Sequence, residues 1–265
     1  MKSGRYLKVA FALFVGVLWI GLPSFVLCGE KVSGKIIQLS DKDRETLAVL
    51  GDGVVGKALP ALPLASVKDL MPLMTTEWVY RITAGGNRGD LQTDSIGKSK
   101  NASAEKSWRR MVGKKYIEYF RVKEGGKLLE ISEADLTEDV ITHYNPPILL
   151  MYDGLRPGET IKQEIKITVY DLDDPTDAKY RGKLAVTHSY VGAYEVSVPA
   201  GRYETVLLKS TFVGKVGPAS VNDFGYVFFS KGHGVVASVE RMHVGAFLFY
   251  NKTTKTPKVL LRKKP

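Results

Sequence analysis

The sequence predicts a mainly β protein built on a curved antiparallel sheet, either an open barrel or a sandwich, with a short helical or irregular N-terminal segment. Between Val198 and Glu240, three apolar runs are separated by Pro199-Ala200-Gly201, Val216-Gly217-Pro218 and Gly232-His233-Gly234. Short β-rich runs cut by Gly and Pro are typical of consecutive antiparallel strands. In residues 161–169, apolar and charged positions also alternate, as expected for a half-buried strand.

The N-terminus carries the features of an export signal. Lys2, Arg5 and Lys8 precede the apolar run Val9–Leu22. A basic region followed by a short apolar region is typical of a secretory signal peptide, and we assign it to residues 1–28. Cleavage after Cys28, lipidation at Cys28 and an uncleaved membrane anchor all remain open. The predicted location is the periplasm or the outer membrane, with membrane association through this segment in the anchored form.

Composition limits the class of protein and its partners. The 265 residues are 44% hydrophobic, enough for a substantial core, and the formal charge is +10. Without the three basic residues of the signal the charge is about +7, which favours weak attraction to anionic surfaces. The longest basic block is Arg262-Lys263-Lys264, so nucleic acid is not a predicted partner. Cys28 is the only cysteine, which excludes an intramolecular disulfide.

Residues 29–74 are predicted to form a polar linker, a short helix and a proline-rich segment. Ser40-Asp41-Lys42-Asp43 precedes ETLAVLG, a capped helix expected to end at Gly51. Pro60, Pro63 and Pro72 exclude one long helix after it. The apolar residues of this segment are expected to pack against the sheet edge or to cover the mouth of an open barrel.

The β domain is predicted to span residues 75–255 in ten to twelve strands, followed by a frayed basic tail over residues 256–265. In KYIEYFRV, residues 115–122, aromatic side chains fall on both faces of the strand. Such a strand is expected to be covered on both sides. A curved sheet that encloses a ligand and an ordinary sandwich both satisfy this pattern.

One resemblance follows from the region around Val198–Glu240. Val198-Pro199-Ala200-Gly201 with Tyr203, Phe224-Gly225-Tyr226 and Gly232-His233-Gly234-Val235 resemble a family of bacterial envelope proteins whose domain has no assigned function. The Pro157-Gly158-Glu159 turn is similar too. The resemblance implies a curved, open-barrel or lipocarrier-like sheet in an exported protein, and it transfers no catalytic residues.

Two candidate sites carry polar chemistry. Asp171, Asp173, Asp174 and Asp177 could gather oxygen ligands around a hard cation such as Ca²⁺, although the pattern departs from an EF-hand and also fits a solvated turn. The histidines show no metal-ligand spacing, although residues 233 and 243 could converge across a hairpin. No nucleophile elbow or nucleotide loop is present, so we predict no catalytic residues and no cofactor.

Alternating aromatic residues are the remaining candidates for a ligand-lining surface. They are Trp78, Tyr80, Tyr116, Phe120, Tyr226, Phe228, Phe247 and Phe249. The leading hypothesis is an exported, non-enzymatic envelope protein that binds or carries an apolar or amphipathic, lipid-like ligand. The alternatives are a structural or assembly factor that binds another envelope protein, and a metal-dependent or hydrolytic enzyme.

Overall fold

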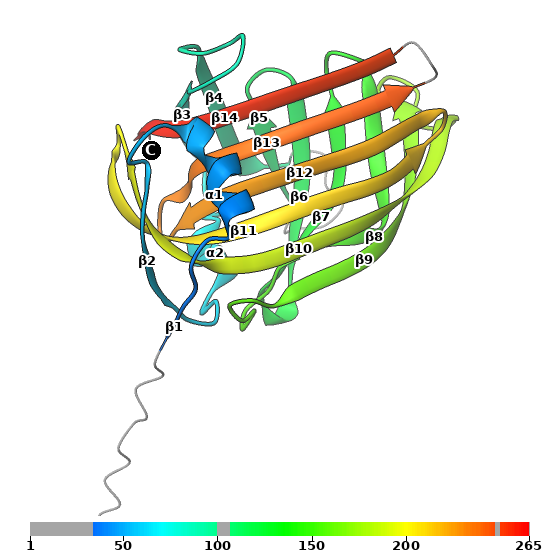
Figure 1. The fold of residues 1–265 in the computed structure, drawn as a ribbon. Coiled ribbons are helices and arrows are strands. Elements are labelled where there is room, and N and C mark those ends of the chain that lie inside the picture. Colours follow the sequence, from blue (N-terminus) through cyan, green and yellow to red (C-terminus); the bar gives the residue numbers. More distant parts are fainter. Residues whose placement is uncertain (1–33, 100–106, 247–249, 265) are drawn as a thin grey trace, which may run out of the picture. The chain divides into compact units, whose positions relative to one another are not determined.

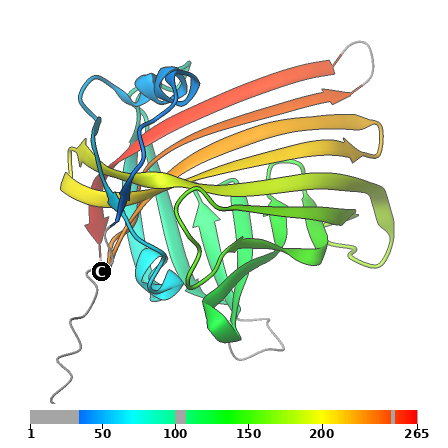
Figure 2. The same ribbon diagram turned by 60° about the horizontal axis from the view of Figure 1, so that its bottom comes forward.

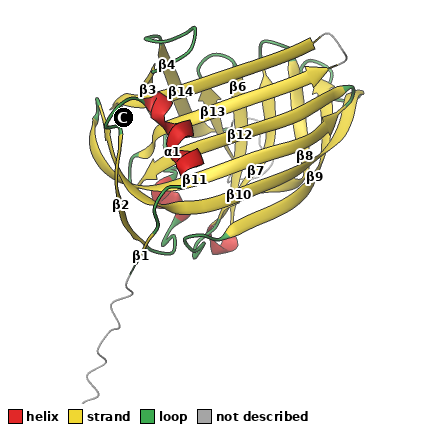
Figure 3. Ribbon diagram, viewed as in Figure 1, coloured by secondary structure: helices red, strands yellow, loops and turns green. Residues whose placement is uncertain are grey.

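The computed structural model describes residues 34–99, 107–246 and 250–264, which belong to one compact unit, Ser33–Pro265. Strands dominate this unit and only short helices accompany them (Figure 3). The predicted signal segment, residues 1–28, lies outside the described residues. In the part of the chain that is described, no helix is long and apolar enough to cross a membrane.

The elements follow one another along the chain with few interruptions (Figure 1). The helical elements are α1 (Asp41–Leu47), η1 (Ala48–Leu50), α2 (Val67–Leu70) and η2 (Glu124–Gly126). The strands are β1 (Lys35–Ile36), β2 (Val55–Ala61), β3 (Thr76–Ile82), β4 (Leu91–Lys98), β5 (Ser107–Val112), β6 (Tyr116–Lys123), β7 (Lys127–Asp135), β8 (Val140–Met151), β9 (Thr160–Asp171), β10 (Ala178–Val198), β11 (Gly201–Val216), β12 (Ala219–Ser230), β13 (Gly234–Ala246) and β14 (Tyr250–Lys264).

Strands β3 to β14 form a closed antiparallel barrel. Each strand pairs with the next one along the chain, and β14 pairs back onto β3 to complete the circuit. β1 and β2 extend the sheet from the second half of β10 (Figure 2). The predicted fold class, a curved antiparallel β structure with a short helical N-terminal segment, is confirmed, and the sheet closes into a barrel instead of a sandwich.

The Gly and Pro punctuation marks the hairpins as predicted. Val198 and Gly201 end β10 and begin β11, Gly217-Pro218 separates β11 from β12, and Gly232 lies in the turn before β13. Gly217 has a φ of 55°, and a Cβ there would lie 2.6 Å from the ring of Tyr180. Glycine is therefore required at this turn for both conformation and space.

The helix predicted after Ser40 forms and packs on the outside of the barrel. The Ser40 hydroxyl accepts a hydrogen bond from the backbone N–H of Asp43, as an N-cap does. Asp43 then accepts from Lys209 Nζ at 2.7 Å and from the Tyr226 hydroxyl at 2.5 Å. Leu47 and Leu50 are buried against this outer face, and Figure 1 shows α1 lying across β11 to β13.

The proline-rich segment lies across one end of the barrel. Leu64 exchanges backbone hydrogen bonds with the β8–β9 turn, and the N–H of Val67 donates to Asp153 Oδ1 at 2.7 Å. The Asp69 carbonyl accepts from Gly232 in the β12–β13 turn. Val67 is fully buried, and α2 ends at Leu70, two residues before Pro72. This segment therefore covers the barrel end where these turns meet.

Two boundaries differ from the sequence prediction. Residues 256–264 do not fray: they complete β14, where Lys258 and Leu260 are buried. Residues 29–74 are not only linker, because β2 pairs with β10. Pairing with neighbouring strands outweighs the local composition in both cases. Residues 140–151 form one long strand, β8, but Pro146 and Pro147 in its middle pair with neither β7 nor β9.

A buried ion cluster lies at the seam where β14 meets β3. Lys258 of β14 reaches past β3 to Asp94 of β4, with Nζ 3.3 Å from Oδ2. Arg110 of β5 binds the same carboxylate oxygen at 2.9 Å. The Lys258 and Asp94 side chains are 1% and 0% exposed. Burial alone would raise the Asp94 pKa, but Lys258 and Arg110 lower it to about 2, so the carboxylate is charged.

We expect Asp94→Asn to destabilise the protein by about 3–5 kcal/mol, because it removes the buried counter-ion of Lys258 and leaves only the half-exposed Glu240, 3.6 Å away. Urea unfolding followed by circular dichroism measures the change. Asp90→Asn, an exposed acid in the β3–β4 turn, is the matched control and should stay within about 0.5 kcal/mol of the natural protein. Adding Lys258→Met to Asp94→Asn should recover part of the loss. Equal stability of Asp94→Asn and Asp90→Asn would contradict the role of the seam cluster.

Candidate ligand-binding cavity

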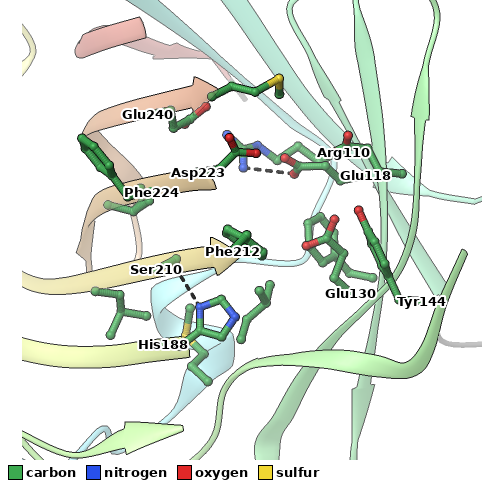
Figure 4. A pocket seen from close by; sticks show the side chains of 18 of the residues that line it. Arg110, Glu118, Glu130, Tyr144, His188, Ser210, Phe212, Asp223, Phe224 and Glu240 are labelled. Carbon is green, nitrogen blue, oxygen red and sulfur yellow. Dashed lines mark hydrogen bonds and ion pairs between the residues drawn. The ribbon is translucent and has the colours of Figure 1, made fainter. Parts of the chain in front are cut away.

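A cavity of about 310 Å³ lies inside the barrel, beyond the segment that covers its end. Its volume is at the lower end of the range for small-molecule sites. Met71 of the covering segment is part of the wall, and side chains of β5 to β8 and β10 to β13 supply the rest (Figure 4). The apolar contributors from the strands are Phe120, Leu150, Met151, Leu184, Leu208, Phe212, Phe224, Val227, Phe229 and Met242.

Strand alternation explains which residues face the cavity. On β11, Leu208, Ser210 and Phe212 line it, while Lys209 between them points to α1 on the outside. Successive side chains of a strand point to opposite faces, so every second residue of β11 reaches the interior.

One wall of the cavity carries three glutamates in place of apolar residues. On adjacent strands, Arg110, Glu118 and Glu133 are consecutive cross-strand neighbours, Arg110 opposite Glu118 and Glu118 opposite Glu133. Glu130 lies opposite Phe120 on the same face. Figure 4 shows Arg110, Glu118 and Glu130 directed into the pocket.

A β-bulge brings Glu130 and Glu133 to the same face. Tyr119 pairs with Ser132 and Phe120 with Glu130, so Ile131 has no partner on β6. An extra residue in one strand reverses the alternation beyond it. Without the bulge, residues three apart would point to opposite faces, and Glu133 would leave the cavity.

These carboxyls are held in an environment that disfavours their charge. Burial, together with the neighbouring acids, raises the pKa of Glu130 well above its ordinary value, and raises that of Glu133 to about 8. For Glu133 the neighbouring acids are Glu118, Asp135, Glu240 and Asp223. The Glu118 side chain is 20% exposed. Because it lines the cavity, its surroundings are still those of the barrel interior.

His188 of β10 lines the cavity from another wall. Its Nδ1 lies 2.7 Å from the Ser210 hydroxyl, and the side chain is 3% exposed. Its Nε2 is buried and has no hydrogen-bond partner in the described part of the chain. Burial lowers the His188 pKa to about 4, so the imidazole is neutral at ordinary pH. No local sequence pattern distinguishes this histidine from the other three.

The predicted ligand-lining aromatic residues lie in several different parts of the barrel. Phe120 lines the cavity. Trp78 and Tyr80 are buried nearer the covered end, where their side chains donate to the carbonyls of His233 and Val235. Tyr116 is half-buried on the cavity side of β6, one alternate position beyond Glu118.

Tyr226 and Phe228 do not line the cavity as predicted, because they lie on the outer face of β12. Their neighbours Gly225, Val227 and Phe229 line the cavity instead. The predicted alternation is present, but the sequence does not tell which of the two faces is interior. Phe247 and Phe249 lie outside the described residues.

The Asp-rich loop does not gather its carboxylates. Asp171 pairs with Lys179 at 2.6 Å, and Asp174 accepts hydrogen bonds from the hydroxyl and N–H of Thr176. Among the described residues, which include all four predicted ligands, no group of three His, Cys, Asp or Glu side chains could hold a metal ion. Asp174 thus forms an Asx turn with Thr176, and Asp173 and Asp177 lie in the same connection between β9 and β10.

Histidine 233 also forms no cluster. Its ring packs edge-on against Tyr203 at 5.0 Å, and Nδ1 lies 2.9 Å from the Lys231 carbonyl. The side chain of residue 243, its suggested partner across the hairpin, is outside the described side chains.

Comparison with known proteins finds structural neighbours only. No family model and no curated protein matches the chain. A "putative lipoprotein" from Parabacteroides distasonis has 15% identity and a TM-score of 0.33, over 72% of this chain and 95% of that one. A "putative exported protein with YmcC-like fold" from Bacteroides fragilis has 14% identity and a TM-score of 0.37, over 77% of this chain and 100% of that one. The "hypothetical lipoprotein YmcC" from Escherichia coli has 13% identity and a TM-score of 0.37, over 85% of this chain and 98% of that one. At these values the matches carry no conclusion about function.

The raised pKa of Glu133 gives a prediction about stability. The folded state keeps this proton up to about pH 8, whereas an unfolded Glu releases it near 4.5, so the folded state binds more protons in between. Stability should therefore fall as pH rises through this interval. We expect Glu133→Gln to match the natural protein near pH 5 and to exceed it by roughly 1–2 kcal/mol at pH 8.

Urea unfolding at several pH values measures the difference. Glu124→Gln, at an exposed position between β6 and β7, is the control and should follow the natural protein at every pH. If Glu133→Gln shows the same loss of stability with pH as the natural protein, the protonated state of Glu133 in the folded protein is contradicted.

Proposed function

We propose that this chain is an exported binding protein of the bacterial cell envelope that holds an apolar or amphipathic molecule inside its barrel. The observation that carries the proposal is the cavity itself, about 310 Å³ of space lined by apolar side chains with a polar wall. A barrel interior of this kind is a usual place for a small ligand. The basic and apolar leader of residues 1–22 supports export.

The arrangement of the covering segment also supports the proposal. Leu64 and Val67 fill one end of the barrel, so the apolar interior is shielded there. The polar groups of the cavity include the glutamates on β6 and β7 and His188 with Ser210 on β10 and β11, and further charged residues line it from β5, β12 and β13. Binding sites typically combine such an apolar surface with a small number of placed polar groups.

Gly225 offers a direct test, because it lines the cavity and has room for a side chain. A Cβ at Gly225 would meet only Glu240, at 4.0 Å. Gly225→Leu should therefore fill part of the cavity without straining the backbone. We expect it to bind the neutral apolar dye Nile red at least about tenfold more weakly than the natural protein, while its melting temperature stays close to the natural value.

Gly97→Leu is the matched control. Gly97 also lies in a barrel strand, and a Cβ there would have nothing within 4 Å, but Gly97 does not line the cavity. The variant should bind Nile red as the natural protein does. Mass spectrometry of solvent extracts should find an apolar or amphipathic molecule with the natural protein and Gly97→Leu, and less with Gly225→Leu. Equal dye binding by all three proteins would refute a ligand site in the barrel.

A further inference from the structure

The acidic wall of the cavity is neutralised only in part: Arg110 binds Glu118, but not Glu130 or Glu133. The side chains of Glu130 and Glu133 form no hydrogen bond or ion pair with the residues that the structure describes. The polar groups of a folded protein are normally satisfied, and half-buried acids that line an interior without a partner have an energetic cost. A pair of such groups facing an internal space therefore requires an explanation.

The cationic side chains near this wall are already engaged. Arg110 binds Asp94 at 2.9 Å and Glu118 at 3.2 Å. Lys258 lies 3.3 Å from Asp94 and 3.6 Å from Glu240. Arg241, the other cation of the cavity lining, lies over the ring of Phe224. Arg110 and Lys258 are thus paired with acids other than Glu130 and Glu133, and Arg241 lies over an aromatic ring.

Tyr144 of β8 adds an aromatic surface next to the free acids. Its pKa is raised well above the ordinary value by burial and by Glu133, Glu130 and Glu118, which places it in their electrostatic field. Figure 4 shows Tyr144 beside Glu130, both directed into the pocket. An ammonium group is attracted both by negatively charged carboxylates and by the face of an aromatic ring. Carboxyl groups beside an aromatic ring are therefore suited to bind it.

His188 supplies independent evidence that the cavity is built for a polar ligand. It is 3% exposed, and its Nε2 has no partner in the described residues. Figure 4 shows one ring nitrogen directed to Ser210 and the other toward the middle of the pocket. A buried hydrogen-bonding atom without a partner in the protein is a place for a ligand group to bind.

We propose that the ligand is a cationic amphiphile, an organic amine whose ammonium group lies at Glu130, Glu133 and Tyr144. Its apolar body then contacts Phe212 and Leu184, and the far side of the cavity presents the free Nε2 of His188 to a polar substituent. This inference rests on the proposed function and specifies its ligand class.

Three probes with the same chain test the charge preference: octylamine, octanol and octanoate, measured by isothermal titration calorimetry at pH 8. We expect octylamine to bind about tenfold more tightly than octanol, and octanoate to bind most weakly. The double variant Glu130→Gln, Glu133→Gln should lose the preference for the amine and keep its affinity for octanol. Glu124→Gln, with an exposed acid removed, should behave as the natural protein.

The imidazole proton signals of His188 provide a second readout that does not depend on affinity. They are assigned by comparison with His188→Gln, and octylamine should shift them if it occupies this cavity. Octanoate or octanol binding as tightly as octylamine would overturn the amine proposal while the proposed binding function stands. Failure of all three probes and of Nile red to bind would remove both.

Discussion

Closure of the barrel at β14 and β3 is the constraint on which the rest of the structure depends. These strands are the last and the first of the barrel, so their pairing joins residues that are far apart in the chain. Lys258 secures the seam from inside by reaching Asp94 on β4, and it lies over the Tyr80 ring at 5.2 Å. A buried lysine is costly without a partner, so this register of β14 is favoured over registers that separate the two charges.

The seam also determines the electrostatics of the cavity. Asp94 takes contacts from both Lys258 and Arg110, and Arg110 in turn binds Glu118. These contacts raise the Arg110 pKa despite its burial, so its charge is permanent. The cluster therefore neutralises itself, and the acids beyond it on β7 receive little compensation. The contacts that close the barrel thus leave the carboxyl groups of Glu130 and Glu133 free to interact with a molecule other than the protein.

The local pattern of the sequence predicts much of the fold, but it does not predict the cavity. Turn residues such as Gly217 and the cap at Ser40 specify hairpins and the first helix through local chemistry. The placement of Glu133 depends on the bulge at Ile131, which exists only once β7 is paired with β6. Alternation also leaves inside and outside equivalent, which is why the sequence prediction places Phe228 on the wrong face while Phe229 lines the cavity.

The outer layer explains how the barrel can be hollow and still stable. Leu47 and Leu50 of the N-terminal segment pack with the outward-facing Leu207, Phe228 and Val259. Apolar burial on this outer face stabilises β11 to β14 whether or not the interior is filled. A barrel with apolar packing only in its interior would lose most of its buried apolar contacts if the interior held a cavity. Apolar packing of the N-terminal segment on the outer face therefore compensates for the packing that is missing inside the hollow barrel.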